Sequence, residues 1–346
     1  MRDTQAFFNG FQGDEWSTQV LRYQGFFNNA ESSDLKDLRM NTYSLAFLRS
    51  FLEKKPVQIS SKSNLIYFKS QFSPINISNH PNEMLTIIRV HDLFPITNPE
   101  WFTRKSRFAF KVGLSQIAPN SLLIANSQST LQALQSVLGN EFSKYKTTVI
   151  PCKFQPRKNS KQCGNCFACK TGIPEAEFLI MVGTLEPRKN YNRVLDAWHL
   201  SKLRKQNIKL VIVGGKGWKC NSTLKKLVNS EDVYYFGYVC DYQLIRLYSD
   251  SLGFLSGSLN EGYNIPLDEA QEFKKSLILS DIEIHKERVN EKGAVWFDPK
   301  SIDSMLMALD NFEPNIESEQ KVYLGNQFSS KFLEFSQKLK MGYFNE

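Results

Sequence analysis

Apolar runs of strand length alternate with helix-like stretches throughout residues 174–312. Continuous apolar strands separated by amphipathic helices are typical of a parallel sheet that helices cover on both faces. This half of the chain therefore predicts a Rossmann-like α/β domain. The expected strands are Glu177–Leu185, Ile208–Gly214, Val233–Val239, Leu252–Ser256 and Ser276–Ser280, and the expected helices are Arg193–Lys205, Ser222–Val228, Asp241–Ser249, Pro266–Phe273 and Ile302–Phe312.

The first half of the chain shows similar segments less regularly. A length of 346 residues suits two domains of about 100–200 residues each. The predicted organisation is a first domain over residues 1–150, a basic connector over 151–173, an α/β domain over 174–312 and a terminal helix within 313–346. Residues 1–64 contain no strand followed by a glycine-rich turn. In this half we expect strands at Leu65–Phe68, Leu85–Val90, Leu122–Ala125 and Thr147–Pro151, and helices at Asn41–Glu53, Lys105–Ala118 and Thr130–Leu138.

The positive charge is concentrated in the first half. Residues 1–173 carry a net charge of +10 and residues 174–346 carry −2. Such asymmetry favours contact with an anionic surface, and the alternative is a solvated basic face. No apolar run approaches the ~18–20 residues that span a bilayer, so we expect a cytoplasmic protein with peripheral contact on the inner face of the membrane. The best candidates for that contact are Arg104, Lys105, Arg107 and Lys111.

Ligands of open α/β sheets bind beyond the carboxyl ends of the strands, so the loops after strands are the places to search. In the loop Gly183–Asn190, Arg188 and Lys189 precede a helix N-terminus, where free N–H groups also attract anions. This loop predicts a diphosphate site, and the alternative is a solvated pair of surface cations. The glycine-rich turn at Gly214–Trp218 permits close backbone approach but also occurs in proteins without a ligand.

Two carboxylates flank the junction after the fourth expected strand. Glu261 lies in the loop, and Glu269 follows on the first turn of the next helix. Across such a junction both side chains can face one cleft, where carboxylates accept hydrogen bonds from sugar hydroxyls. Alternatively, Glu269 complements the helix dipole and Glu261 is solvated.

The connector carries a cysteine run with metal-ligand spacing. Cys163, Cys166 and Cys169 form a C-x2-C-x2-C run, and Cys152 lies eleven residues upstream. Four thiolates can close a tetrahedral zinc site, so we expect a structural zinc. An iron–sulfur cluster uses similar spacings, and a reduced insert without metal is the third interpretation. Cys220 and Cys240 are isolated in the sequence, which favours ordinary packing roles for both.

In combination, these motifs resemble the retaining glycosyltransferases of the GT-B fold, family 4 (group 1). The resemblance runs from Phe178 to Pro299 and includes the Val182–Asn190 block and the Glu261/Glu269 pair. A weaker similarity covers the first domain. The main resemblance also includes Phe236–Val239, Ser280–Ile282 and Phe297–Pro299. The weaker similarity consists of Val90–Leu93, Pro99–Glu100 and Ala125–Ser127.

The resemblance implies an α/β protein with two Rossmann-like domains facing each other across a cleft, the second binding a nucleotide sugar and the first its acceptor. It implies that Lys189, with Arg188 beside it, binds the donor diphosphate, that Glu261 contacts the donor sugar and that Glu269 holds the ribose. His91 would face the reacting sugar. The remaining implied donor contacts are Gly183, Tyr238, Val239, Gly262 and Asn264.

The reaction implied is hexosyl transfer with retention of configuration to a glycan or lipid-linked acceptor. Transferases of bacterial polysaccharide assembly, often mannosyl-transferring, carry the most similar Glu-Pro-Arg-Lys-Asn block. The chain has no Asp-x-Asp triplet, so no metal cofactor is expected for catalysis. Three departures stand out: Thr184 replaces the usual Arg, Asn264 replaces the usual Gly, and the opening glycine-rich loop is matched poorly by Gly10 and Gly13.

Two other functions stay open at this point. The departures from the family pattern favour a catalytically degenerate GT-B protein that binds a nucleotide sugar or a partner. A basic first half with a cysteine knuckle is typical of some nucleic-acid-binding modules. The connector, however, has only Phe154 and Phe167 as aromatic residues. Nucleic acid is therefore the less favoured partner.

Overall fold

The computed structural model describes residues 19–22, 25–28, 65–69, 84–118, 121–152, 163–314, 331 and 334–335. The chain forms two compact units: Met1–Lys153 with Asn326–Glu346, and Phe154–Gly325. We refer to them as the first and second units. The helices predicted at Asn41–Glu53 and within Ile316–Met341 lie outside the described ranges, apart from isolated residues of the latter.

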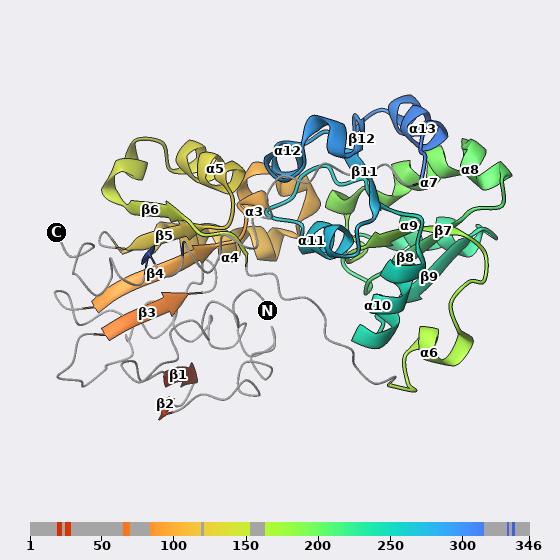
Figure 1. Ribbon diagram of the computed structural model, residues 1–346. Coiled ribbons are helices and arrows are strands. Elements are labelled where there is room, and N and C mark those ends of the chain that lie inside the picture. The colour runs from red at the N-terminus through yellow and green to blue at the C-terminus, as the bar shows by residue number, and fades with distance from the viewer. Residues whose placement is uncertain are drawn as a thin grey trace. The chain divides into compact units, whose positions relative to one another are not determined.

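The first unit contains a four-stranded parallel sheet in the order β3-β4-β5-β6 (Figure 1). All four strands were predicted from the sequence to within two residues at their starts, and helices α4 and α5 match two predicted helices. The bounds are β3 Leu65–Lys69, β4 Met84–Val90, α3 Phe94–Thr97, a 3-10 turn at Pro99–Trp101, α4 Arg104–Ser115, β5 Leu122–Ala125, α5 Gln128–Leu138, a 3-10 segment at Gly139–Lys144 and β6 Lys146–Val149.

An antiparallel pair in the N-terminal region was not predicted. Strands β1 (Gln19–Arg22) and β2 (Gly25–Asn28) pair in the register Gln19↔Asn28 to Arg22↔Gly25. Neither strand of this pair was among the expected elements of residues 1–64. Its strands have four residues each, too few for a periodic pattern to show in the sequence.

The second unit contains a six-stranded sheet in the order β12-β11-β10-β7-β8-β9, with every neighbouring pair parallel. The chain proceeds outward from β7 to β9, then returns to β10 and proceeds outward in the other direction. The order therefore reverses between β7 and β10, which is the topological switch point of a doubly wound sheet. The bounds are β7 Phe178–Val182, β8 Lys209–Val213, β9 Val233–Gly237, β10 Gly253–Ser256, β11 Ser276–Ser280 and β12 Val295–Phe297.

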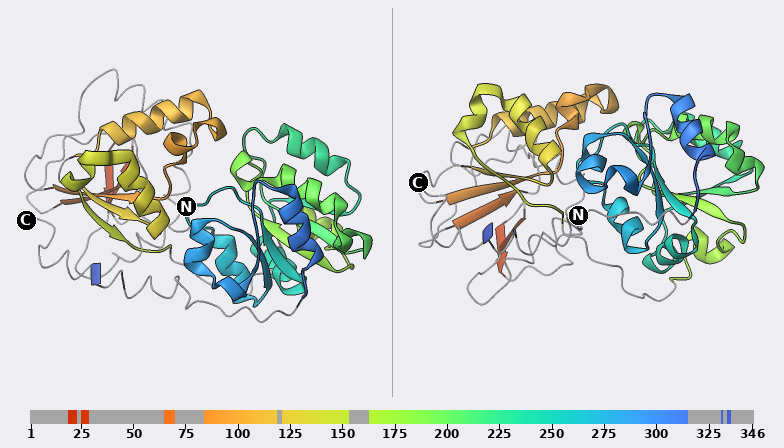
Figure 2. Two further views of the ribbon diagram at one scale, coloured as in Figure 1. Left: turned by 90° about the horizontal axis from the view of Figure 1, so that it is seen from above. Right: turned by 45° about the horizontal axis from the view of Figure 1, so that its top comes forward.

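Helices cover both faces of this sheet, as Figure 2 shows from two further sides. Alternate residues of β7 enter opposite layers: Leu179 and Met181 pack with α7 and α13, whereas Phe178 and Ile180 pack with α10 and α11. This alternation is why the strand is apolar throughout. The helices are α6 Phe167–Thr171, a 3-10 turn at Pro187–Lys189, α7 Tyr191–Leu200, α8 Lys202–Lys205, α9 Asn221–Val228, α10 Asp241–Asp250, α11 Ile265–Glu272, α12 Glu283–Arg288, a 3-10 turn at Glu291–Gly293 and α13 Ile302–Asp310.

Most predicted elements of the second unit are confirmed, with one helix divided. The helix expected at Arg193–Lys205 breaks at Ser201, whose backbone is extended and whose hydroxyl accepts a hydrogen bond from the Arg204 amide. Serine competes with helix continuation by capping the next turn. Helices α6 and α12 and strand β12 were not predicted. No described helix has the length and apolar character needed to cross a membrane.

Candidate donor site at the switch point

The loops after β7 and β10 flank the switch point of the six-stranded sheet. The loop after β7 carries Arg188 and Lys189 in a 3-10 turn, and the loop after β10 carries Glu261. The two strands are paired, with Gly253 opposite Leu179. Their carboxyl ends therefore lie side by side, at the edge where ligands of such sheets bind.

Glycines let the loops after β7 and β8 run in close contact. A Cβ on Gly214 would lie 1.9 Å from the Gly183 carbonyl oxygen, so no other residue fits there. The Leu185 amide donates to the Gly215 carbonyl at 2.9 Å, and the Gly217 amide donates to the Leu185 carbonyl at 3.1 Å. The glycine-rich turn at Gly214–Trp218 thus has a packing role in holding the loop after β7.

Gly183 leaves room for the Lys189 side chain. A Cβ on Gly183 would lie 3.0 Å from Lys189 Cε and 3.2 Å from its Nζ. The lysine stem therefore crosses the backbone at the end of β7. This contact explains why a glycine begins the loop, and it directs the ammonium group of Lys189 toward the loop after β10.

Glu261 joins the two cations through both of its oxygens. Lys189 Nζ donates to Glu261 Oε1 at 2.6 Å, and Arg188 donates to Glu261 Oε2. Ser258 Oγ also donates to Oε1 at 2.7 Å, while the other amino group of Arg188 reaches Glu186 Oε1 at 2.5 Å. We call Arg188, Lys189 and Glu261 the charge cluster. All three side chains are less than one fifth exposed.

The environment keeps Glu261 ionised. Burial disfavours its charged form, but the charges of Arg188 and Lys189, with hydrogen bonds from Lys189 and Ser258, outweigh burial. Together they hold the pKa of Glu261 at about 2, below its ordinary value of 4.5. The cluster carries two positive charges and one negative charge from its three members, and the carboxylate of Glu186, which also pairs with Arg188, lies beside them.

Asn190 fixes the charge cluster to three loops. It adopts a left-handed conformation with φ 59° between the 3-10 turn and α7, which asparagine tolerates better than most residues. Its side-chain amide donates to the Gly257 carbonyl at 3.0 Å and to the Pro299 carbonyl at 2.7 Å. Asn190 therefore ties the loops after β7, β10 and β12 together, which the order of motifs along the sequence could not reveal.

Asn264 occupies a second left-handed position, with φ 68° at the N-terminus of α11. Its side-chain amide lies 2.9 Å from His285 Nε2 and donates to Ser256 Oγ at 3.2 Å. His285 Nδ1 lies 2.9 Å from the Ser280 carbonyl, which only accepts, so Nδ1 carries a proton and Nε2 accepts from Asn264. Burial lowers the pKa of His285 to about 4, which keeps the ring neutral. His285 therefore holds the side chain of Asn264, the residue that replaces the usual Gly of the family pattern. The sequence did not predict His285 as part of the site.

A buried ion pair holds the loop from its other side. Arg288 on α12 pairs with Asp268 on α11, and both side chains are at most 2% exposed. Arg288 also donates to the carbonyls of Tyr263 and Asn264, and its guanidinium lies 4.3 Å from the centre of the Tyr263 ring. Neither Arg288 nor Asp268 was predicted as part of the site, because nothing in the sequence marks these two charges as partners.

The other predicted donor contacts lie in the same unit. Glu269 is buried on α11, where the Tyr248 hydroxyl lies 3.0 Å from its Oε2. Gly262 is also buried, next to Glu261. Val239 is buried after β9, whereas the neighbouring Tyr238 is 76% exposed. These positions follow the carboxyl ends of β9 and β10, as the sequence predicted.

His91 belongs to the first unit, where it follows β4 directly. The next residue, Asp92, accepts a hydrogen bond from the Phe94 amide at 3.3 Å, which fits the start of α3. In the same sheet, Asn126 and Ser127 are buried after β5, and Ser127 Oγ accepts from the Thr130 amide at 3.0 Å. The segments of the weaker sequence similarity therefore also follow strand ends.

The predicted metal-ligand set needs one correction. The sulfur atoms that gather are those of Cys163, Cys166, Cys169 and Cys240. Cys152 is buried in the first unit beside Asn126, whose side-chain amide nitrogen lies 3.9 Å from its sulfur. The prediction that Cys152 joins the run was wrong, and Cys240, which was expected to have an ordinary packing role, lies with the run instead. Tertiary folding brings Cys240 to the run from 71 residues away, which sequence spacing cannot show.

Comparisons with known proteins agree with this geometry. The family model described as "Glycosyl transferases group 1" matches residues 169–324. The serotype-specific mannosyltransferase WbdA of Escherichia coli is 29% identical over 226 residues, covering 60% of this chain and 27% of that protein. The chain therefore spans about a quarter of the length of this relative. The O-antigen chain mannosyltransferase B of Escherichia coli is 25% identical over 225 residues, covering 62% of this chain and 58% of that protein.

Solved structures confirm the GT-B fold class. The crystal structure of Anabaena Alr3699/HepE in complex with UDP and glucose superposes with a TM-score of 0.55 at 14% sequence identity. The superposition covers 88% of this chain and 76% of that one. At this identity the likeness concerns the fold alone. Residues 169–324 match the group 1 glycosyltransferases, and the two relatives described above are similar to this chain over 60–62% of its length.

Proposed function

We propose that this protein transfers a hexose, mannose in the first instance, from a nucleotide-diphosphate sugar to a glycan or lipid-linked acceptor with retention of configuration. The observation that carries the proposal is the charge cluster at the switch point of the second unit. Arg188 and Lys189 converge there on one buried carboxylate, at the sheet edge where nucleotides bind in doubly wound folds.

The two cations suit a diphosphate better than a neutral ligand. Arg188 offers several N–H donors in a fixed plane, and Lys189 adds a compact positive charge. As the bond to the sugar breaks, negative charge grows on the departing diphosphate, and fixed cations stabilise it without reorganising. Glu261 keeps Arg188 and Lys189 oriented, and its oxygens can also accept hydrogen bonds from sugar hydroxyls.

The other site residues receive roles by the same proposal. Glu269 would hold the ribose, and the backbone at Tyr238 and Val239 would lie beside the base. Asn264 and Gly262 would bring the backbone of the loop close to the phosphates, with Asn264 held by His285. His91 of the first unit would face the reacting sugar. The acceptor hydroxyl would attack on the face from which the diphosphate leaves, with a phosphate oxygen taking its proton and no covalent enzyme intermediate.

Mannose is proposed as the sugar because both relatives described above are named mannosyltransferases. Incubation with a panel of nucleotide sugars and cell-envelope glycan extracts, followed by measurement of the nucleoside diphosphate released, tests the transferase activity. We expect acceptor-dependent release with a mannose donor. Magnetic resonance of the product then shows whether the anomeric configuration is retained. Release with none of the donors would instead support a binding protein without turnover.

A basic face of α4 is the proposed contact with an anionic membrane that holds a lipid-linked acceptor. Arg104, Lys105 and Lys111 are exposed on this helix, Arg107 is partly exposed, and the ring of Phe108 among them is 55% exposed. Cations near an anionic leaflet contribute about 1 kcal/mol each. We expect the protein to sediment with vesicles containing phosphatidylglycerol but not with neutral vesicles, and salt to release it. No sedimentation with anionic vesicles at low salt would contradict a membrane contact.

A further inference from the structure

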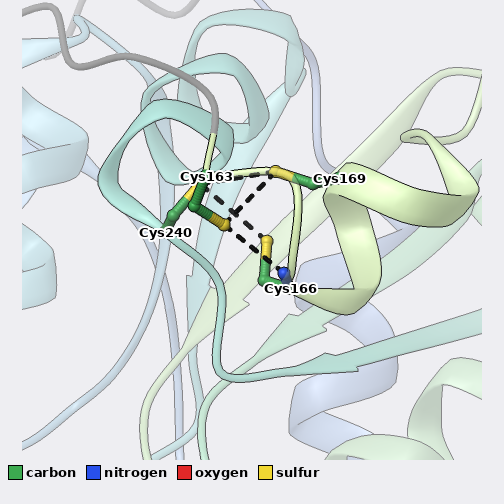
Figure 3. A group of neighbouring side chains, drawn as sticks. All are labelled: Cys163, Cys166, Cys169 and Cys240. Carbon is green, nitrogen blue, oxygen red and sulfur yellow. Dashed lines mark hydrogen bonds between the residues drawn. The ribbon is translucent and has the colours of Figure 1, made fainter.

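Four cysteine sulfurs meet at one point of the second unit (Figure 3). Cys163, Cys166 and Cys169 come from the segment that leads into and through α6, and Cys240 is the residue before α10. All four sulfur atoms lie within 4.8 Å of one another. The closest pairs are Cys169–Cys240 at 3.5 Å, Cys163–Cys169 at 3.7 Å and Cys166–Cys240 at 3.8 Å.

These separations are those of ligands around a single ion. Four thiolates at about 2.3 Å from a tetrahedral zinc ion lie about 3.8 Å from one another. We propose that Cys163, Cys166, Cys169 and Cys240 bind one structural zinc ion. The site lies outside the charge cluster and uses no residue of the proposed donor site.

The local backbone places a hydrogen-bond donor at one of the four sulfurs. Gly164 turns the chain between the first two cysteines with φ +71°, a conformation that other residues rarely adopt. That turn directs the Cys166 amide at Cys163 Sγ, with N···S 3.4 Å. An N–H donor aimed at a sulfur stabilises its charged form, and such outer hydrogen bonds are a regular feature of metal sites.

Other uses of four cysteines fit the geometry less well. Two disulfides would each bring one pair of sulfurs to about 2 Å, whereas Cys169 is nearly equidistant from Cys163 and Cys240. A cluster of several irons binds each thiolate to one of its metal atoms and so spreads the sulfurs beyond a single coordination sphere. The closeness of all four sulfurs therefore favours one ion, and four cysteines in a tetrahedral arrangement form a common structural zinc site.

A zinc ion here would fasten a short helix to the sheet. Helix α6 has five residues, too few to be stable by its own hydrogen bonds. Its contacts with the second unit include the fully buried Ala168 and the Phe167 ring, whose centre lies 6.0 Å from that of Phe236. Cys240 would connect this helix covalently, through the metal, to the start of α10.

The same ion would fix the loop after β9, because Cys240 directly follows Tyr238 and Val239. This consequence rests on the proposed function, in which that loop lies beside the base of the donor. Loss of zinc should therefore weaken nucleotide binding as well as the attachment of α6. Zinc content is measured without a nucleotide, so failure of the metal site and failure of the proposed function give different results.

Elemental analysis of the purified chain tests the site. We expect about one equivalent of zinc and no iron. Cys163→Ser and Cys240→Ser should each reduce the zinc content sharply. Cys163 is exposed, so its replacement should disturb the fold only through the loss of the metal. Cys152→Ser is the matched control and should retain zinc. Zinc absent from the wild-type chain expressed with zinc in the medium, iron in its place, or zinc lost on Cys152→Ser would each overturn the proposal.

Cobalt substitution examines the ligand set directly. Cobalt(II) in place of zinc should give the intense visible and near-ultraviolet absorption of a tetrahedral thiolate site. Cys163→Ser should weaken the sulfur-to-cobalt absorption, and Cys152→Ser should leave it unchanged. An octahedral cobalt spectrum, or one that Cys163→Ser leaves unchanged, would contradict the assigned ligands.

Discussion

Replacing Glu261 with glutamine is expected to lower kcat for sugar transfer by about two orders of magnitude, the usual cost of disturbing a fixed electrostatic contact at a reacting centre. The amide keeps the shape of the side chain but cannot accept hydrogen bonds from both Arg188 and Lys189, which now share its two carboxylate oxygens. Steady-state kinetics measures the effect. Glu272→Gln on the exposed face of α11 is the control and should retain activity.

The same variant should alter acid stability. The pKa of Glu261 in the folded chain, about 2, lies below its ordinary value of 4.5. Its ionisation therefore contributes stability above pH 4.5, and this contribution disappears as the pH falls toward 2. A pKa shift of this size corresponds to a contribution of about 3 kcal/mol to the free energy of unfolding. Urea unfolding should show a smaller loss of stability across this window in Glu261→Gln than in the wild type. Identical pH profiles would mean that Glu261 is not held by the two cations.

Replacing Arg288 with methionine is expected to reduce the free energy of unfolding by about 3–5 kcal/mol, because it leaves the buried carboxylate of Asp268 without the opposite charge of Arg288. The variant also removes two donors to the carbonyls of Tyr263 and Asn264. Urea denaturation measures the loss. Lys286→Met on the same helix is the matched control, because Lys286 and Asp281 form an exposed pair that solvent screens.

Two outcomes of that comparison would contradict the account. Equal stability losses for Arg288→Met and Lys286→Met would mean that the buried Arg288–Asp268 pair contributes no more to stability than the exposed Lys286–Asp281 pair. An Arg288→Met variant as stable as the wild type would mean that the loop before α11 does not depend on this arginine.

The sequence predicted the parallel sheets because their central strands, such as β5, β8 and β11, are almost entirely buried and consist of nearly continuous apolar runs. Strand β11 was predicted with its observed bounds, since polar residues flank Ser276–Ser280 on both sides. Strand β12 has only three residues, and α12 only six. Segments of that length are fixed by neighbours in space, so local pattern could not reveal them.

The charge cluster was predicted as separate residues, and the structure adds how they are paired. Order along the chain indicated that Lys189 and Glu261 each follow the carboxyl end of a strand. Only the fold shows that these two strands are neighbours and that the side chains share a hydrogen bond. His285 and Arg288 support the loop from a helix that the sequence did not predict. Cys240 was not predicted as a member of the cysteine group, because the cysteines that it approaches in the fold lie more than 70 residues away along the chain.

Calorimetric titration of guanosine and uridine diphosphates into the wild-type chain and Lys189→Ala tests the central claim most directly, that the charge cluster binds a diphosphate. Lys225→Ala, on the exposed face of α9, is the control. The comparison uses the nucleotide that binds the wild type more tightly. We expect this nucleotide to bind Lys189→Ala about tenfold or more weakly, because the variant loses one charge-assisted hydrogen bond of about 1.5–3 kcal/mol. Lys225→Ala should bind it as the wild type does. Undiminished affinity in Lys189→Ala would contradict the account.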